Sequence, residues 1–213
     1  MPNQPLYLKS LPLFPLGAVL FPDGEVPLRV FEARYLDVIV KCHNLRAPFG
    51  VVTLTRGSEV RTPDAAREQF EAVGTLATIT HLEQAQPGLL LIQCRGGQRF
   101  QIEQSSRLKN GLWVADAVML APDAAVKVPG DLLPIAQMLR QLFDGLRLHR
   151  APVPRPEDTR YDDCGWVANR WAELLPMPLA TRQRLMALDS PLVRLELMAD
   201  MLTRNGIGSG AER

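Results

Sequence analysis

The stretch Leu11-Pro-Leu-Phe-Pro-Leu-Gly-Ala-Val-Leu-Phe-Pro22, followed by Pro27-Leu-Arg-Val-Phe-Glu-Ala-Arg-Tyr-Leu36, decides how this chain begins to fold. Prolines at positions 12, 15, 22 and 27 exclude a helix, because each removes a backbone N–H and fixes φ. Each proline also favours extended backbone at the residue before it. Apolar residues fill the gaps, so the pattern predicts extended, partly buried chain at a sheet edge or barrel rim.

Three charges stand together where this extended chain gives way to a helix: Arg29, Glu32 and Arg34. Charges at a chain reversal favour a salt-bridge network that fixes the turn, and this structural role is the one we predict. Removing Glu32 would then destabilise the β domain without altering ligand binding. The alternative is a recognition patch, since arginine binds a carboxylate or phosphate bidentately.

The chain up to about residue 120 reads mainly as strands and turns. Apolar spacing predicts one helix, over 33–45. Short apolar or alternating runs predict strands over 49–54, 73–82, 89–94, 99–103 and 113–118. Turns are expected at Pro87-Gly88, at Lys109-Asn-Gly111 and at Arg95-Gly-Gly97, the last as a hairpin between two strands. These elements predict a small, partly closed β-barrel or pair of sheets over residues 8–122.

Helical spacing dominates the remainder, and a helical bundle is predicted over residues 130–205. Asp131 can cap its first helix, Asp162 and Asp163 suit the start of the next long helix, and Ser190-Pro191 the start of the last. Residues 206–213 are expected to form a flexible tail. The fold class is therefore α+β, a β domain followed by a helical bundle.

The opening run resembles the start of the Lon N-terminal domain family, the substrate-binding domain of ATP-dependent Lon proteases. The similarity continues through Phe49-Gly-Val-Val52, Val73-Gly-Thr-Leu-Ala77 and Gly97-Gln-Arg-Phe-Gln-Ile102, and returns over 185–202 with Arg194-Leu-Glu196. It covers about residues 10–205. The resemblance implies a PUA-like β domain followed by a helical bundle, in a stand-alone form without the ATPase and peptidase domains.

Bulk properties fit a cytoplasmic globular protein. The chain has 213 residues and a formal charge of +1, so no global field favours nucleic acid or an anionic membrane. The three cysteines are an odd number at unrelated spacings, as expected of reduced thiols. No signal peptide and no apolar run of membrane-spanning length is recognised.

The sequence contains no recognisable catalytic, cofactor or metal motif. No Gly-Lys pair occurs, so the phosphate-binding loop of an ATPase is missing, and no lysine lies in a peptidase context. Cys42 and His43 diverge on a helix and predict a buried thiol beside a surface imidazole. Cys164 is expected to pack rather than react, because Asp162 and Asp163 oppose a lowered thiol pKa.

One tryptophan does suggest a binding role. On the helix after Asp162, Trp166 projects away from the main apolar stripe and shares its side with Arg170. Together they are our candidate partner-binding residues, since a tryptophan among polar neighbours can anchor a partner. The role that we favour for Trp166 is to seat the bundle against the β domain, because large aromatic side chains are mostly buried.

We therefore expect a non-catalytic module that binds unfolded or degron-bearing polypeptides or acts as an adaptor. Its partner would then be a separate ATP-dependent protease. Such a function needs an exposed apolar groove, expected where the two subdomains meet. The alternative is an RNA-binding PUA-like protein, since Arg95, Arg99 and Arg107 surround one set of strands. The balanced charge argues against nucleic acid.

Overall fold

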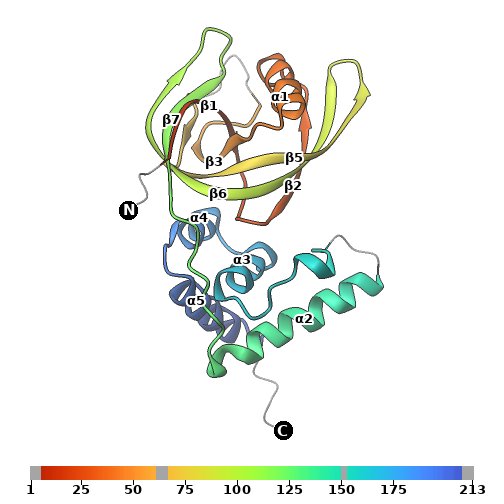
Figure 1. Cartoon of the computed structure of the whole chain (residues 1–213), viewed down its shortest axis with the longest axis vertical. Helices are drawn as coiled ribbons and strands as arrows, with labels where there is room; N and C mark the ends of the chain where they lie inside the picture. Colours follow the sequence, from red (N-terminus) through yellow and green to blue (C-terminus); the bar gives the residue numbers. More distant parts are fainter. Residues whose placement is uncertain (1–5, 61–66, 150–152, 208–213) are drawn as a thin grey trace. The chain divides into compact units, whose positions relative to one another are not determined.

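The computed structural model describes residues 6–60, 67–149 and 153–207, and it consists of two units (Figure 1). The first contains Met1–Pro122 and Leu179–Ala187, and the second contains Asp123–Pro178 and Leu188–Arg213. The fold class is α+β as predicted, with a β-barrel in the first unit and helices in the second.

The proline-rich opening forms two strands, β1 (Tyr7–Leu16) and β2 (Glu25–Val30). β1 pairs antiparallel with β7 (Trp113–Met119) through residues 7–13 and parallel with β3 (Phe49–Arg56) through residues 13–16. Pro12 lies in the half of β1 that pairs with β7, and Pro15 lies in the half that pairs with β3. Each proline thus has a neighbouring strand on one side, as an edge strand does, and its missing N–H is tolerated. The predicted extended conformation is confirmed.

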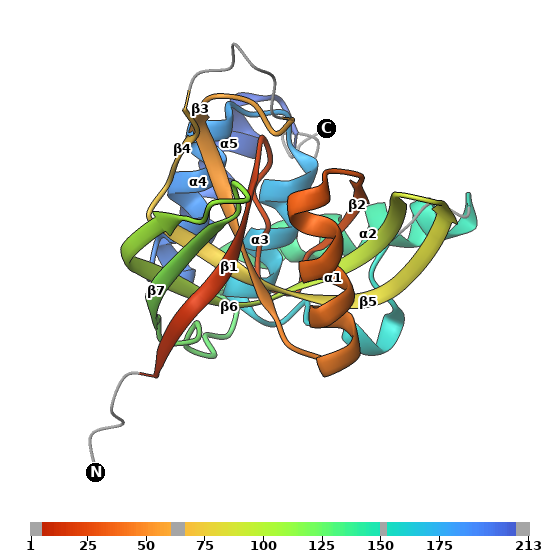
Figure 2. The ribbon, with the colours of Figure 1, turned by 90° about the horizontal axis from the view of Figure 1, so that it is seen from above.

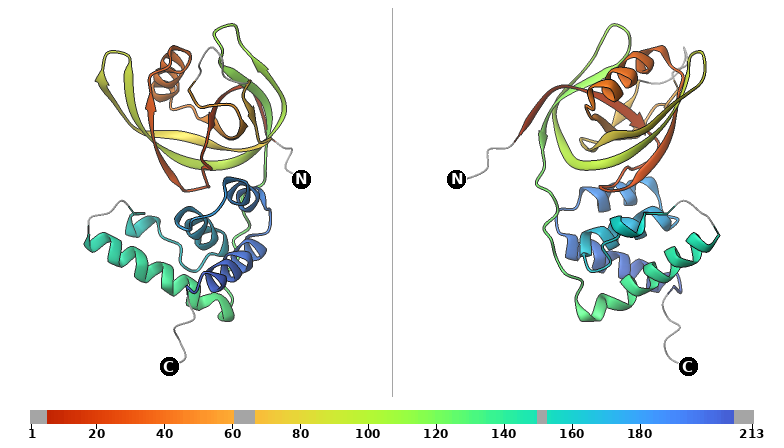
Figure 3. Two further views of the ribbon diagram at one scale, coloured as in Figure 1. Left: turned by 180° about the vertical axis from the view of Figure 1, so that it is seen from behind. Right: turned by 45° about the vertical axis from the view of Figure 1, so that its right-hand side comes forward.

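Five strands close a ring in the order β1–β7–β6–β5–β3 and back to β1. The long strands are β5 (Val73–Gln86) and β6 (Leu89–Arg107), which pair as an antiparallel hairpin around the predicted turn at Gly88. The tip of this β5–β6 hairpin projects beyond the ring (Figure 3). β2 pairs with the first half of β6, and β4 (Gln69–Phe70) pairs with β3.

The expected hairpin turn at Arg95-Gly-Gly97 is wrong, because β6 runs through it without reversing. A Cβ built on Gly96 would lie 2.1 Å from the backbone oxygen of Phe21. The glycine is needed for this close approach, which backbone hydrogen bonds of Gly96 with Asp23 and Gly24 secure. The pair of glycines thus marks a place where two backbones meet inside a strand, which sequence reasoning reads as a turn.

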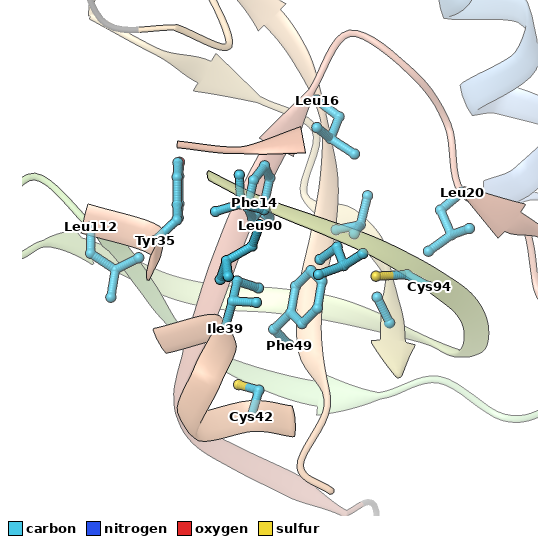
Figure 4. Packing of buried hydrophobic residues seen from close by; sticks show 14 residues of the cluster. Phe14, Leu16, Leu20, Tyr35, Ile39, Cys42, Phe49, Leu90, Cys94 and Leu112 are labelled. Carbon is cyan, nitrogen blue, oxygen red and sulfur yellow. The ribbon is translucent and has the colours of Figure 1, made fainter. Parts of the chain in front are cut away.

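Helix α1 (Ala33–Leu45) spans the residues predicted for it and ends at Arg46, which has a left-handed conformation. Its inner face contributes Tyr35, Ile39 and Cys42 to the larger apolar cluster of the barrel (Figure 4). The Tyr35 ring stacks on Phe14 of β1, with ring centroids 4.1 Å apart. Figure 2 shows α1 lying beside β1 and β3, so the proline-rich run and the helix that follows it share one core.

Helix α4 (Leu179–Ala187) belongs to the β unit, although the sequence places it in the helical bundle. The amide of Gln183 accepts a hydrogen bond from the Thr53 hydroxyl and donates one to the carbonyl of Val73. The carbonyl of Met186 accepts a hydrogen bond from the guanidinium of Arg99. These specific polar contacts assign α4 to the barrel, and a helical apolar pattern cannot indicate them.

The second unit contains a 3-10 turn η1 (Gly130–Leu132), α2 (Leu133–Leu148), a 3-10 turn η2 (Pro156–Asp158), α3 (Cys164–Leu174) and α5 (Pro191–Arg204). The predicted caps at Asp163 and Ser190 each accept a hydrogen bond from the backbone N–H of the third residue of their helix. Asp131 makes no capping hydrogen bond, because it lies within η1 rather than before α2. Gly206 and Ile207 complete the end of α5, and the rest of the predicted tail lies outside the described residues.

A buried arginine organises this helical unit. Arg194 of α5 is fully buried, and its two Nη atoms bond both carboxylate oxygens of Asp123, at 2.5 and 3.2 Å. It also donates to the side chain of Asn169 on α3 and to the carbonyl of Leu188. One side chain therefore joins the start of the unit, α3 and the segment before α5.

Candidate functional site

A solvent-open groove of about 570 Å³ lies beside α1 in the β unit. Helix α1 supplies one side of it with Leu36, Asp37, Val38, Val40, Lys41 and Asn44. The tip of the β5–β6 hairpin supplies the other side with Gln84, Gly88 and Leu90. The volume lies within the range of ligand-binding sites in proteins, so this groove is our candidate functional site.

The groove exists because α1 is amphipathic in an unusual way. Its core face is held by Tyr35, Ile39 and Cys42, yet a second apolar pair, Leu36 and Val40, lies one helical turn apart on another side. Leu36 packs in part against the barrel core, whereas Val40 is 41% exposed. Val40 and the part of Leu36 that the core leaves uncovered form a narrow apolar strip in the groove.

Four polar side chains line the groove: Asp37, Lys41 and Asn44 from α1, and Gln84 from the hairpin. Within the described part of the chain, none of the four has a side-chain hydrogen bond or an ion pair. Asp37 and Lys41 are spaced four residues apart, as helix ion pairs are, but they do not form one at 4 Å among these residues. The groove therefore offers both donors and acceptors next to its apolar strip.

Two of the three signature charges form a buried network at the start of α1. The guanidinium of Arg34 lies 2.8 Å from a carboxylate oxygen of Glu32 and 2.9 Å from one of Glu68. It also donates to the carbonyls of Glu59 and Gly111. Burial opposes the charge of Glu68, but a backbone hydrogen bond and Arg34 hold the pKa of this carboxyl below its usual value. The network joins the helix to two loops of the barrel.

The third signature charge does not belong to this network. Arg29 is exposed on β2, and no ion pair is seen for it among the described residues. Strand alternation explains this, because Val30 points inward and its neighbour must point to solvent.

Trp166 and Arg170, the predicted partner-binding residues, lie in the interior rather than at the surface. Trp166 is 3% exposed and packs edge-on against Tyr161 and Phe143. Arg170 is 2% exposed and donates to the carboxylate of Glu173. An exposed-anchor role does not fit this burial. The helical wheel misleads here because α3 is buried on all sides from Cys164 to Ala172. The role of Trp166 in seating the bundle on the β domain stays a prediction.

The arginines considered for RNA binding serve the fold. Arg95 pairs with Asp23 at 3.3 Å, and Arg107 lies 3.9 Å from Glu68. Arg99 is 3% exposed and bonds the end of α4. Their charges are compensated or buried, so they do not form an open basic strip for phosphates.

The three cysteines are buried, and His43 beside Cys42 is exposed as predicted. Burial raises the pKa of all three thiols, and it raises that of Cys94 to about 12. At Cys164 the charges of Asp163 and Glu196 raise the pKa further. These are packing thiols rather than nucleophiles. Within the described ranges, no group of three His, Cys, Asp or Glu side chains could hold a metal ion.

Comparison with known proteins agrees with this architecture. A family profile of the ATP-dependent protease La (LON) substrate-binding domain matches residues 10–204. This chain belongs to the Lon substrate-binding domain family. The structure of a Lon N-terminal domain protein from Xanthomonas campestris is 30% identical and has a TM-score of 0.70, with 91% of this chain and 98% of that chain covered.

Two further similarities extend the family relationship. The N-terminal domain of the Mycobacterium avium complex Lon protease has the same fold, at 19% identity and a TM-score of 0.58, over 92% of this chain and 98% of that chain. A Lon protease of Xanthomonas oryzae pv. oryzae is 26% identical over 204 residues, which are 94% of this chain and 23% of that protein. This Lon-family chain thus spans about a quarter of the length of that curated relative.

Sequence reasoning did not find the groove of this Lon-family domain. A signal for the groove in the sequence is Val40, an apolar residue on a helix whose core face is already formed by Tyr35, Ile39 and Cys42. The groove predicted at the junction of the two subdomains stays a prediction, and the groove found here lies within the first unit. None of the helices among the described residues combines the length and apolar character that a membrane span requires.

Proposed function

We propose that this chain is a non-catalytic recognition module that binds unfolded or degron-bearing polypeptides. The observation that supports this most is the match of residues 10–204 to a substrate-binding domain. An open groove with an apolar strip and free polar groups is the kind of surface such binding needs. Hydrolysis of ATP or of a peptide bond is not part of the proposal.

The module would act together with a separate ATP-dependent protease. The proposal of such a partner is supported by the Lon protease relative, of which this chain matches about a quarter. A recognition module of this kind would hold or present a chain, and degradation would depend on the partner.

The test is binding of the full chain to a permanently unfolded polypeptide, for which we name reduced and carboxymethylated lactalbumin. Fluorescence anisotropy of the labelled polypeptide measures the affinity, and native lactalbumin and a single-stranded RNA serve as comparisons. We expect saturable binding of the unfolded protein and much weaker binding of the other two. Preferential, salt-sensitive binding of RNA would overturn the proposal in favour of the RNA alternative.

A further inference from the structure

We infer that the groove beside α1 binds an extended polypeptide segment of about four residues and recognises its main chain. This inference rests on the proposed function and adds to it the site and the conformation of the ligand. The polar groups, the apolar strip and the size of the groove all favour such a ligand.

The polar groups favour a ligand whose backbone is unpaired. The side chains of Asn44 and Gln84 each carry one acceptor and two donors, and they come from opposite sides of the groove. Neither has a hydrogen-bond partner in the described ranges of the chain. Backbone N–H and C=O groups are already paired in helices, sheets and folded surfaces, but not in an unfolded chain. A groove with free amides on both sides therefore selects extended over helical segments.

The apolar strip and the charges define the side chains that fit. Val40 and the uncovered part of Leu36 offer aliphatic surface, so they favour aliphatic residues in the ligand. Leu90 lies at the wall of the groove but is 6% exposed and belongs to the barrel core. The ionisable residues of the lining are Asp37 and Lys41, whose charges cancel. A charged segment of either sign meets one like and one opposite charge in the groove, so the lining gives it no net attraction. The preferred segment is therefore uncharged.

The length follows from the helix that forms one side. The lining residues of α1 run from Leu36 to Asn44, which at 1.5 Å per residue is about 12 Å. An extended chain advances about 3.3 Å per residue, so roughly four residues fit along this side. A short uncharged aliphatic segment is a common feature of unfolded proteins and is buried in folded ones.

A matched pair of variants tests the site. Val40 on α1 and Val193 on α5 are both helical and both 41% exposed, so Val40→Asp and Val193→Asp make the same change at equal exposure. The probe is a fluorescein-labelled peptide of alternating valine and alanine flanked by glycine and serine, measured by anisotropy against the full chain. We expect Val40→Asp to weaken binding about tenfold or more and Val193→Asp to leave it unchanged. The double variant Asn44→Ala and Gln84→Ala changes only exposed side chains and should weaken binding to a similar degree. It keeps the test valid should Val40→Asp fail to fold.

The ligand itself can be altered to test main-chain recognition. Methylation of the central backbone nitrogens keeps the side chains and removes the N–H donors, so we expect this peptide to lose most of its affinity. Equal binding of the methylated peptide would overturn main-chain recognition. Unfolded lactalbumin that binds both groove variants like the unaltered chain would overturn the site and leave the proposed function standing. Failure of every unfolded ligand to bind the unaltered chain would instead overturn the proposed function.

Discussion

Replacing Asp123 by alanine should unfold the helical unit far more readily than its position near the start of that unit suggests. The carboxylate is the counter-charge of Arg194, which has no exposed surface, and both Nη atoms of the arginine bond it. Without Asp123, the guanidinium keeps its hydrogen bonds to Asn169 and to the carbonyl of Leu188 but no longer has this charged partner.

The expected loss of stability can be bounded from the burial of the two groups. Breaking a buried ion pair from one side costs about 3–5 kcal/mol, whereas an exposed pair contributes about 0–1 kcal/mol. Arg194 is fully buried but the side chain of Asp123 is 19% exposed, so some water can reach the remaining charge. We therefore expect about 3 kcal/mol for Asp123→Ala. This is a large part of the stability of an ordinary domain, about 5–15 kcal/mol.

The assay is native-state hydrogen exchange of the full chain at increasing denaturant, read separately in α3 and α5 and in the barrel strands β5 and β6. Protection should fall in the two helices, because the pair belongs to their unit. The control is Glu157→Ala, which removes a carboxylate of an exposed pair with Arg155 at 3.7 Å. The double variant Asp123→Ala and Arg194→Met should be less damaged than Asp123→Ala alone, because it buries no unpaired charge. A cost for Asp123→Ala below about 1 kcal/mol, or equal to that of the control, would refute the reasoning.

Three further predictions concern Gly96, Cys94 and Glu68 of the β unit, and Gly145 of the helical unit serves as the control for the first. Gly96→Ala should cost about 3 kcal/mol or more by thermal unfolding, because the new methyl meets a backbone oxygen at 2.1 Å. Gly145→Ala in α2, where nothing lies within 4 Å, should instead be neutral or stabilise by up to about 1 kcal/mol. The thiol of Cys94 should resist alkylation in the folded protein, and rapid alkylation at pH 8 without denaturant would contradict this. Because folding raises the pKa of this thiol from 9.0 to about 12, the unfolded chain loses the proton first, and folding stability should fall as the pH rises between these two values. A backbone hydrogen bond and Arg34 lower the pKa of Glu68, so its contribution to stability is present above pH 4.5 and lost below it. Glu68→Gln should therefore make the free energy of unfolding less dependent on pH on the acid side. A pH dependence equal to that of the unaltered chain would contradict this.

Local rules predicted the elements of this protein well. The prolines of the opening run require extended chain, and β1 and β2 are extended. Helix α1 spans the residues that its apolar spacing indicates. Asp163 caps α3 because a short acceptor side chain before a helix can reach an unpaired N–H. In each case the physical cause lies within a few neighbouring residues.

Contacts between distant segments decided the rest. Gly96 has the sequence pattern of a turn but lies within a strand, and the backbone oxygen of Phe21, far away in sequence, is the reason. Trp166 belongs to the polar side of its helical wheel, yet α3 is enclosed on every side and buries it. The groove depends on the β5–β6 hairpin lying beside a helix some forty residues earlier. The sequence alone determined the family, through its opening motif, and those elements whose causes are local, such as β1, α1 and the cap of α3. Only the tertiary structure determined which surfaces remain open, because burial depends on neighbours that the local pattern does not specify.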